Sequence, residues 1–149
     1  MSILSVVIFL VVTVGGGLAI GYLTRPDGWY AGLNKPAFNP PNWVFGPVWT
    51  ILYVLIAVAG ARVFAVAGGG TATAAWAAAL ALNFLWSPVF FGLRRPAAAL
   101  VVVLALLAVI VVFVVLSWPV DRLAALLFLP YAAWVAFAAT LNAAVVRLN

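Results

Sequence analysis

The residues best suited to bind a ligand are seven aromatic side chains between Trp29 and Tyr53, in the sequence WYAGLNKPAFNPPNWVFGPVWTILY. They are Trp29, Tyr30, Phe38, Trp43, Phe45, Trp49 and Tyr53. Indole and phenol faces stack on large, flat, apolar molecules. Together with Pro26 just before it, the stretch also holds five of the nine prolines. We therefore expect a loop that covers a pocket, with the other helices as its walls.

The composition indicates that most of this chain is surrounded by lipid. Of its 149 residues, 69% are hydrophobic and 6% are charged, too few polar groups to cover a soluble domain of this size. The chain has no Cys and no His, and its one Met is Met1. Disulfides are excluded, and a zinc or copper site has no suitable ligands. The net charge of +5 is scattered between apolar runs, which is typical of positive loops and does not indicate nucleic acid as a partner.

The pattern predicts an all-α membrane protein, a bundle of five transmembrane helices in one domain, residues 1–149. Each apolar run is close to the 20 residues that a spanning helix needs. The expected helices cover residues 3–23, 43–66, 71–91, 97–118 and 123–146, and the aromatic, Pro-rich loop covers residues 24–42. Asn39 is expected to cap the second helix, and the aliphatic fourth helix is expected to face lipid.

Cations set the predicted orientation. Five of them, Arg25, Lys35, Arg94, Arg95 and Arg147, fall on one side of the predicted bundle. By the positive-inside rule this side is cytoplasmic, so the N-terminus is outside and the C-terminus is cytoplasmic.

Three helices carry polar and aromatic residues at helical spacing, each set on one face. The sets are Phe45, Trp49 and Tyr53 on the second helix; Asn83, Trp86, Ser87 and Phe90 on the third; and Tyr131, Trp134, Ala138 and Asn142 on the fifth. At about 1.5 Å per residue, Trp49, Asn83 and Trp134 lie roughly 12 to 18 Å from the cytoplasmic ends of their helices. All three faces therefore converge beneath the aromatic loop, which predicts one pocket.

Simpler interpretations compete with a pocket. Trp and Tyr near helix ends commonly mark the membrane interface. This would explain the positions of Trp29, Tyr30, Trp43 and Trp118, and Trp76 is expected to be an interfacial residue as well. An Asn in the middle of a membrane is either a contact between helices or part of a site, and for Asn83 both remain open. Trp49 and Trp134 lie too deep for the interface, so a pocket is favoured.

The aromatic loop sequence resembles the signature of the translocator protein family, also called tryptophan-rich sensory proteins (TspO/MBR, the peripheral benzodiazepine receptor group). LNFLWSPVFFG at residues 82–92 and PYAAWVAFAATLN at residues 130–142 resemble its third-helix and fifth-helix motifs. The resemblance covers the whole chain in order. It implies a homodimer and a pocket that binds porphyrins, haem and synthetic ligands, with no required cofactor.

The resemblance also implies roles for particular residues. Trp49 and Trp134 match the two tryptophans tied to light-dependent porphyrin breakdown. Residues at positions that match ligand contacts are Tyr30, Pro41, Tyr53, Asn83, Phe90 and Ala138. Ala79 replaces a Gln found in many members, and LNAAVVRLN near the C-terminus lacks the aromatic residue of the animal cholesterol motif, which argues against sterol specificity.

The expected function is a porphyrin-binding sensory protein of tetrapyrrole regulation in the bacterial inner membrane, with at most weak light-driven turnover. The alternative is a transporter of tetrapyrroles or other hydrophobic molecules, but coupled carriers commonly use buried ionisable groups. The acids here are Asp27 and Asp121, both in loops. Small residues on one face of the third helix, Thr71, Ala75 and Ala79, predict the dimer contact, and Gly17 with Gly21 predicts close packing of the first helix.

Overall fold

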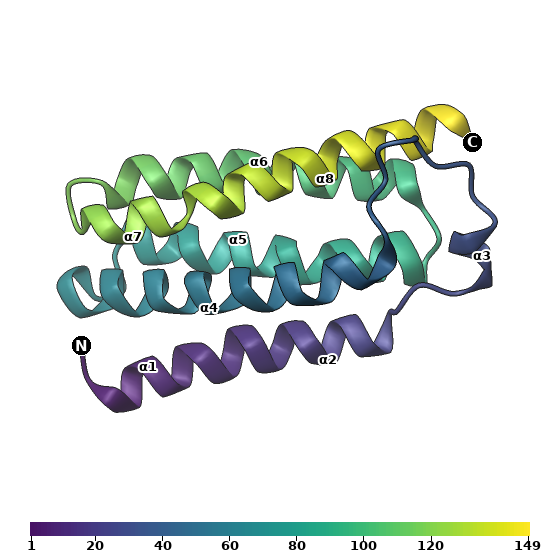
Figure 1. The fold of residues 1–149 in the computed structure, drawn as a ribbon. Coiled ribbons are helices and arrows are strands. Elements are labelled where there is room, and N and C mark those ends of the chain that lie inside the picture. Colours follow the sequence, from purple (N-terminus) through teal and green to yellow (C-terminus); the bar gives the residue numbers. More distant parts are fainter.

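The computed structural model describes residues 1–149, and every regular element in it is helical (Figure 1). Five segments are long and apolar enough to span a membrane. The elements are α1 (Ile3–Leu10), η1 (Val11–Gly15), α2 (Gly16–Leu23), α3 (Gly28–Ala31), α4 (Asn42–Ala67), α5 (Thr71–Ser87), η2 (Pro88–Gly92), α6 (Pro96–Ser117), α7 (Arg122–Leu127) and α8 (Leu129–Leu148). The prediction of five transmembrane helices is confirmed.

The predicted helix bounds are close to the observed ones. The helices also contain irregular turns that the hydrophobic pattern of the sequence did not predict. The first span contains a π-helical turn, η1, and the third ends in another, η2, at Pro88. The last span is interrupted at Phe128, so that Pro130 lies in the first turn of α8, where a proline is tolerated. The predicted cap is wrong: Pro41, not Asn39, occupies the cap position of α4, and its side chain cannot accept a hydrogen bond.

The five spans form an elongated bundle with the chain termini at opposite ends (Figure 1). The C-terminus lies at the end that carries α3, and the N-terminus lies near the α7 end. The first span packs on α4 through α1 and η1, and α4 also packs on α5 and α7. The loop between the first two spans therefore covers one end of the bundle.

The fourth span has one buried face and one exposed face, so the expectation that it faces lipid holds for only part of its surface. α6 packs extensively against both α5 and α8. One face of it is buried along its whole length, through Ala99, Val103, Leu106, Ile110, Phe113 and Ser117. In lipid the buried and exposed faces of a helix can have the same aliphatic composition, because lipid tails are as apolar as Leu.

Small residues on α5 serve packing within the chain. Ala75 is 9% exposed and Ala79 is 1% exposed, so neither presents a surface to a second copy. The residues predicted for the dimer contact are therefore unsuitable apart from Thr71, and the exposed alanines of α5 are Ala74, Ala77, Ala78 and Ala81.

Trp76 was expected at the membrane interface, but it lies inside the bundle. Its indole N–H donates to the carbonyl of Ile56 at 2.8 Å, and its ring lies against Gly60, where an added Cβ would be 2.5 Å from the indole. Close packing of the first helix is confirmed for Gly17, whose Cβ would be 2.2 Å from the Tyr53 ring, but Gly21 faces open space.

The alanines of α5 give a matched test of this packing. Ala79→Leu inserts a larger side chain into a filled interior and should destabilise the protein by about 1–3 kcal/mol. Ala78→Leu, one residue away on the exposed face, should change stability little. Thermal unfolding of both variants in mild detergent measures the difference, and equal shifts in both would contradict the observed packing of α5.

The predicted orientation can be tested with single cysteines, since the chain has none of its own. Gly69 and Gly92 are exposed at the two ends of the third span. In intact cells, an impermeant thiol reagent should label Gly69→Cys from outside and leave Gly92→Cys unlabelled until the membrane is opened. The opposite pattern would reverse the assignment of the N-terminus to the outside.

Candidate ligand-binding site

A cavity of about 490 Å³ lies inside the end of the bundle that the first loop covers. Its volume is in the range of small-molecule sites, which are mostly apolar with a few polar groups. The cavity brings together eleven of the thirteen residues that the three helix faces and the family resemblance single out: Tyr30, Phe45, Trp49, Tyr53, Asn83, Trp86, Ser87, Phe90, Trp134, Ala138 and Asn142. The three predicted faces therefore converge on one cavity.

Pro41 and Tyr131 are the two residues of this set that do not line the cavity. Pro41 is exposed at the start of α4. Tyr131, also on the predicted face of the last helix, is fully buried behind the cavity wall. Its place in the fold is structural, and it acts through Asn83.

The walls of the cavity are aromatic rings in contact with one another. On α4, Trp49 lies beside Tyr53, with ring centroids 5.5 Å apart. Trp134 on α8 meets the edge of Phe45 from α4, at 5.8 Å. These spacings are those of favourable aromatic pairs, so the two deep tryptophans are held on walls formed by α4 and α8.

Asn83 joins three helices at the base of the cavity. The Tyr53 hydroxyl donates to its Oδ1 at 3.3 Å, and its Nδ2 donates to the Tyr131 hydroxyl at 2.6 Å. Asn83 on α5 thereby links α4 to α8, and it also lines the cavity. The two interpretations of Asn83, helix contact and site residue, are therefore both correct descriptions of its geometry.

One buried donor in the cavity wall has no partner. The Nε1 of Trp134 is inaccessible to solvent and makes no hydrogen bond, the only buried side-chain polar atom of the chain in this state. The neighbouring indole of Trp86 donates to the Oδ1 of Asn142 at 3.0 Å. Since buried polar groups are normally paired, this N–H is an exception, and with no accessible surface it does not face the cavity that the Trp134 ring lines.

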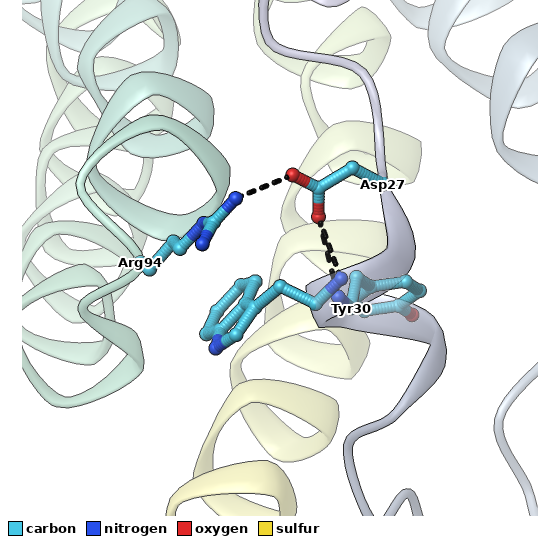
Figure 2. A network of polar contacts seen from close by, with 4 residues as sticks. Asp27, Tyr30 and Arg94 are labelled. Carbon is cyan, nitrogen blue, oxygen red and sulfur yellow. Dashed lines mark hydrogen bonds and ion pairs between the residues drawn. The ribbon is translucent and has the colours of Figure 1, made fainter.

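The loop above the cavity is fixed by Asp27 (Figure 2). One carboxylate oxygen accepts from the backbone N–H groups of Trp29 and Tyr30, which caps α3, and the other pairs with Arg94 at 3.0 Å. Tyr30 is thereby held over the cavity, where it is 7% exposed. Lys35 lies 4.7 Å from the Tyr30 ring centroid on its other side.

Charge and hydrogen bonds favour the ionised form of Asp27. Desolvation raises its pKa, but the Tyr30 N–H and the Arg94 guanidinium outweigh it, so the pKa lies below the ordinary value of 3.8. Arg94 has a positive φ of 55°, uncommon for a residue with a side chain, and the ion pair holds it there. The link between the first and third loops is therefore intact at neutral pH.

Residues of the first span also line the cavity, which the sequence analysis missed. They include Leu18, Gly21, Tyr22 and Thr24 on and after α2. The Thr24 hydroxyl lies 2.6 Å from that of Ser87 on α5. Only Tyr22 could have indicated this wall, as an aromatic residue near the C-terminal end of its helix.

The fold and the cavity define a multi-pass membrane protein with an aromatic pocket beneath a Pro-rich loop. The TspO/MBR family model matches residues 7–148, and the chain belongs to that family. It is 44% identical over 135 residues to a tryptophan-rich sensory protein of Cereibacter sphaeroides, covering 91% of this chain and 85% of that protein.

Two further relatives span bacteria and animals. Protein CrtK of Rhodobacter capsulatus is 42% identical, over 88% of this chain and 84% of that protein. The translocator protein of Homo sapiens is 43% identical, over 81% of this chain and 75% of that protein. The predicted family resemblance is thus confirmed.

The two acids provide a matched test of the loop link. Asp27 caps α3 and pairs with Arg94, and Asp121 caps α7 and pairs with Arg62 at the other end of the bundle. Asp27→Ala should increase amide hydrogen exchange in residues 28–33 several-fold and leave residues 122–127 unchanged. Asp121→Ala should do the reverse, and exchange that rises at both ends in either variant would point to general unfolding.

The same link should respond to acid in one direction. Because the pKa of Asp27 is lowered in the folded protein, its stabilising effect is complete above the ordinary pKa and is lost as pH falls through the lowered value. Exchange in residues 28–33 of the wild type should therefore not depend on this carboxylate between pH 5 and 8. Below pH 3.8 the wild type should approach the Asp27→Ala variant.

Proposed function

We propose that this protein binds a porphyrin-type tetrapyrrole in the cavity beneath the first loop and acts in tetrapyrrole sensing or handling in a bacterial cell membrane. The observation that carries the proposal is the aromatic wall of the cavity, where Trp49 lies against Tyr53 and Trp134 lies against Phe45. A flat macrocycle would cover such walls.

The residues of the cavity support an aromatic ligand. Trp49 and Trp134 line it from different helices, and Ala138, one turn beyond Trp134, is a small side chain on the same lining. Large aromatic side chains contribute strongly to affinity where they are desolvated in a pocket. Contact of one planar ring system with both indoles is part of the proposal.

Charge supports a ligand with carboxylates at the loop end. Arg25 makes no ion pair or hydrogen bond and lies over the Tyr22 ring at 4.8 Å from its centroid. Lys35, in contrast, already donates to the carbonyls of Ala31 and Leu33. Arg25 is thus the better partner for an anionic edge of the ligand.

Binding by stacking also fits the residue inventory. The chain offers no His or Cys to a bound iron, and Met1 is its one Met, so haem would be held without these common axial ligands. Affinity for the metal-free macrocycle and for haem should therefore be similar, and we propose that no resident cofactor is needed.

Relatives carry the names sensory protein and translocator protein, and sensing is the function we propose here. Weak light-driven porphyrin breakdown at Trp49 and Trp134 would be a secondary activity. Transport remains the alternative, and Asp27 and Asp121 are both engaged in ion pairs in loops, so proton coupling lacks a group at depth. We further propose a homodimer through the exposed alanine face of α5.

Two substitutions of Trp134 test the contribution of its ring. Trp134→Ala should weaken protoporphyrin binding by about tenfold or more, since losing a pocket aromatic costs about 2 kcal/mol or more. Trp134→Phe keeps an aromatic ring and should weaken binding less than Trp134→Ala does. Quenching of tryptophan emission during porphyrin titration gives the affinities.

Trp118→Ala is the matched control, because Trp118 is 45% exposed at the far end of the bundle and lies under Arg122. It should leave the affinity unchanged. If Trp118→Ala and Trp134→Ala weaken binding equally, the cavity is not the binding site. Counting porphyrin consumed per protein under light, and uptake into sealed vesicles, then separates a binder from an enzyme or a transporter.

A further inference from the structure

The cavity opens to the side of the bundle, between α2 and α4. Most residues that line it are buried or half-buried, and those that are exposed gather in one place. The exposed lining residues are Leu18, Gly21, Tyr22, Pro26, Asn42 and Gly46. All six lie on α2, just after it, or at the start of α4, so they form the rim of a lateral opening.

Most of this rim lies within the membrane-spanning segments. Leu18 and Gly21 belong to the first span, and Gly46 belongs to the second, whereas Pro26 lies in the loop between them. Counted at about 1.5 Å per residue, Gly46 is roughly 6 Å and Leu18 roughly 8 Å inside the ends of their helices. The opening therefore begins near the membrane interface and extends along the side of the bundle towards the lipid.

The gap follows from how the first span is held. Its N-terminal half, formed by α1 and η1, packs on α4, where the Thr13 hydroxyl donates to the Tyr53 carbonyl at 3.2 Å. Beyond η1, α2 packs on α5. An added Cβ at Gly21 or at Gly46 would meet no atom within 4 Å, so both positions face open space, although Gly17 of α2 still lies against the Tyr53 ring of α4.

The loop end of the cavity is more closed than the gap between α2 and α4. Tyr30 covers the cavity, and the Asp27–Arg94 ion pair holds its loop. A second attachment joins the loop to the last helix: the Asn34 N–H donates to the Asn149 side chain at 3.0 Å, and that side chain donates back to the Asn34 carbonyl at 2.9 Å. Entry from water would require these contacts to break.

We propose that the cavity is loaded from the lipid leaflet through the gap between α2 and α4, by a planar amphiphile whose anionic edge is met by Arg25. This inference rests on the proposed porphyrin binding and adds its route. Arg25 follows Thr24 and precedes Pro26, both cavity residues, and its guanidinium lies over Tyr22 on the rim. A tetrapyrrole dissolved in the bilayer would slide in edge-on, with its carboxylates kept at the interface.

Substitutions of Gly21 form a graded obstruction of the gap. Gly21→Ala, Gly21→Leu and Gly21→Phe place growing side chains in space that is empty in the folded chain. Gly46 is less suitable, because it precedes Pro47, and a Cβ before proline disfavours the helical conformation. Gly15 is the control: it lies in the same span, is exposed and has no atom near its Cβ, but it does not line the cavity.

The readout is the rate of protoporphyrin binding to proteoliposomes, followed by stopped-flow quenching of tryptophan emission. Association and dissociation should both slow with side-chain size, by tenfold or more in Gly21→Phe. Gly15→Phe should bind at the wild-type rate. Arg25→Gln should slow association, and this effect should fade as salt is raised.

Entry from water is tested by a cross-link that ties the first loop to the C-terminal end of the last helix. Asn34→Cys with Asn149→Cys, joined by a short bifunctional thiol reagent, should leave both rates unchanged, because the lateral gap stays open. Unchanged rates in Gly21→Phe, or binding abolished by this cross-link, would overturn the inference. A dissociation constant weakened in step with a faster dissociation rate would also do so, because Gly21 would then be only a contact residue.

Failure of the route and failure of porphyrin binding give different results. If the wild type does not bind protoporphyrin saturably, the proposed function falls. The route is then read from Ala138→Cys on the cavity wall, labelled by a pyrene maleimide dissolved in the bilayer. Gly21→Phe should slow this labelling tenfold or more and Gly15→Phe should not; equal rates in the two backgrounds would overturn the lateral route.

Discussion

The amide of Asn83 is the interaction on which the binding end of the bundle depends. It accepts from Tyr53 and donates to Tyr131, so α4, α5 and α8 meet at one side chain. Inside a membrane no water can replace these bonds, and an unpaired buried hydroxyl costs about 1–3 kcal/mol. Trp49 packs against both tyrosines, so the same amide sets the position of an indole in the cavity wall.

Much of the fold and most of the site could be predicted because their residues differ from their surroundings. Trp49, Asn83 and Trp134 are polar or aromatic in an aliphatic chain, and their helical spacing defines faces that must meet if the helices are antiparallel neighbours. Apolar length alone gives the five spans. Chemical contrast along the sequence therefore carries this information.

The errors fall where such contrast is missing. α6 is aliphatic on every face, and in lipid a face that contacts protein needs no different side chains from one that contacts tails. The spacing of Ala75 and Ala79 permits close approach of a helix, but it does not say whether that helix belongs to the same chain. The lateral opening depends on the direction that α2 takes beyond η1, which no residue type records.

Both acidic side chains serve as helix caps in loops, each tied to an arginine, and this has a consequence for bioenergetics. There is no carboxylate and no histidine inside the spans. Under the proposed function, no such side chain would couple binding to a proton gradient. Occupancy of the cavity would then follow the amount of ligand dissolved in the bilayer, in energised and resting cells alike.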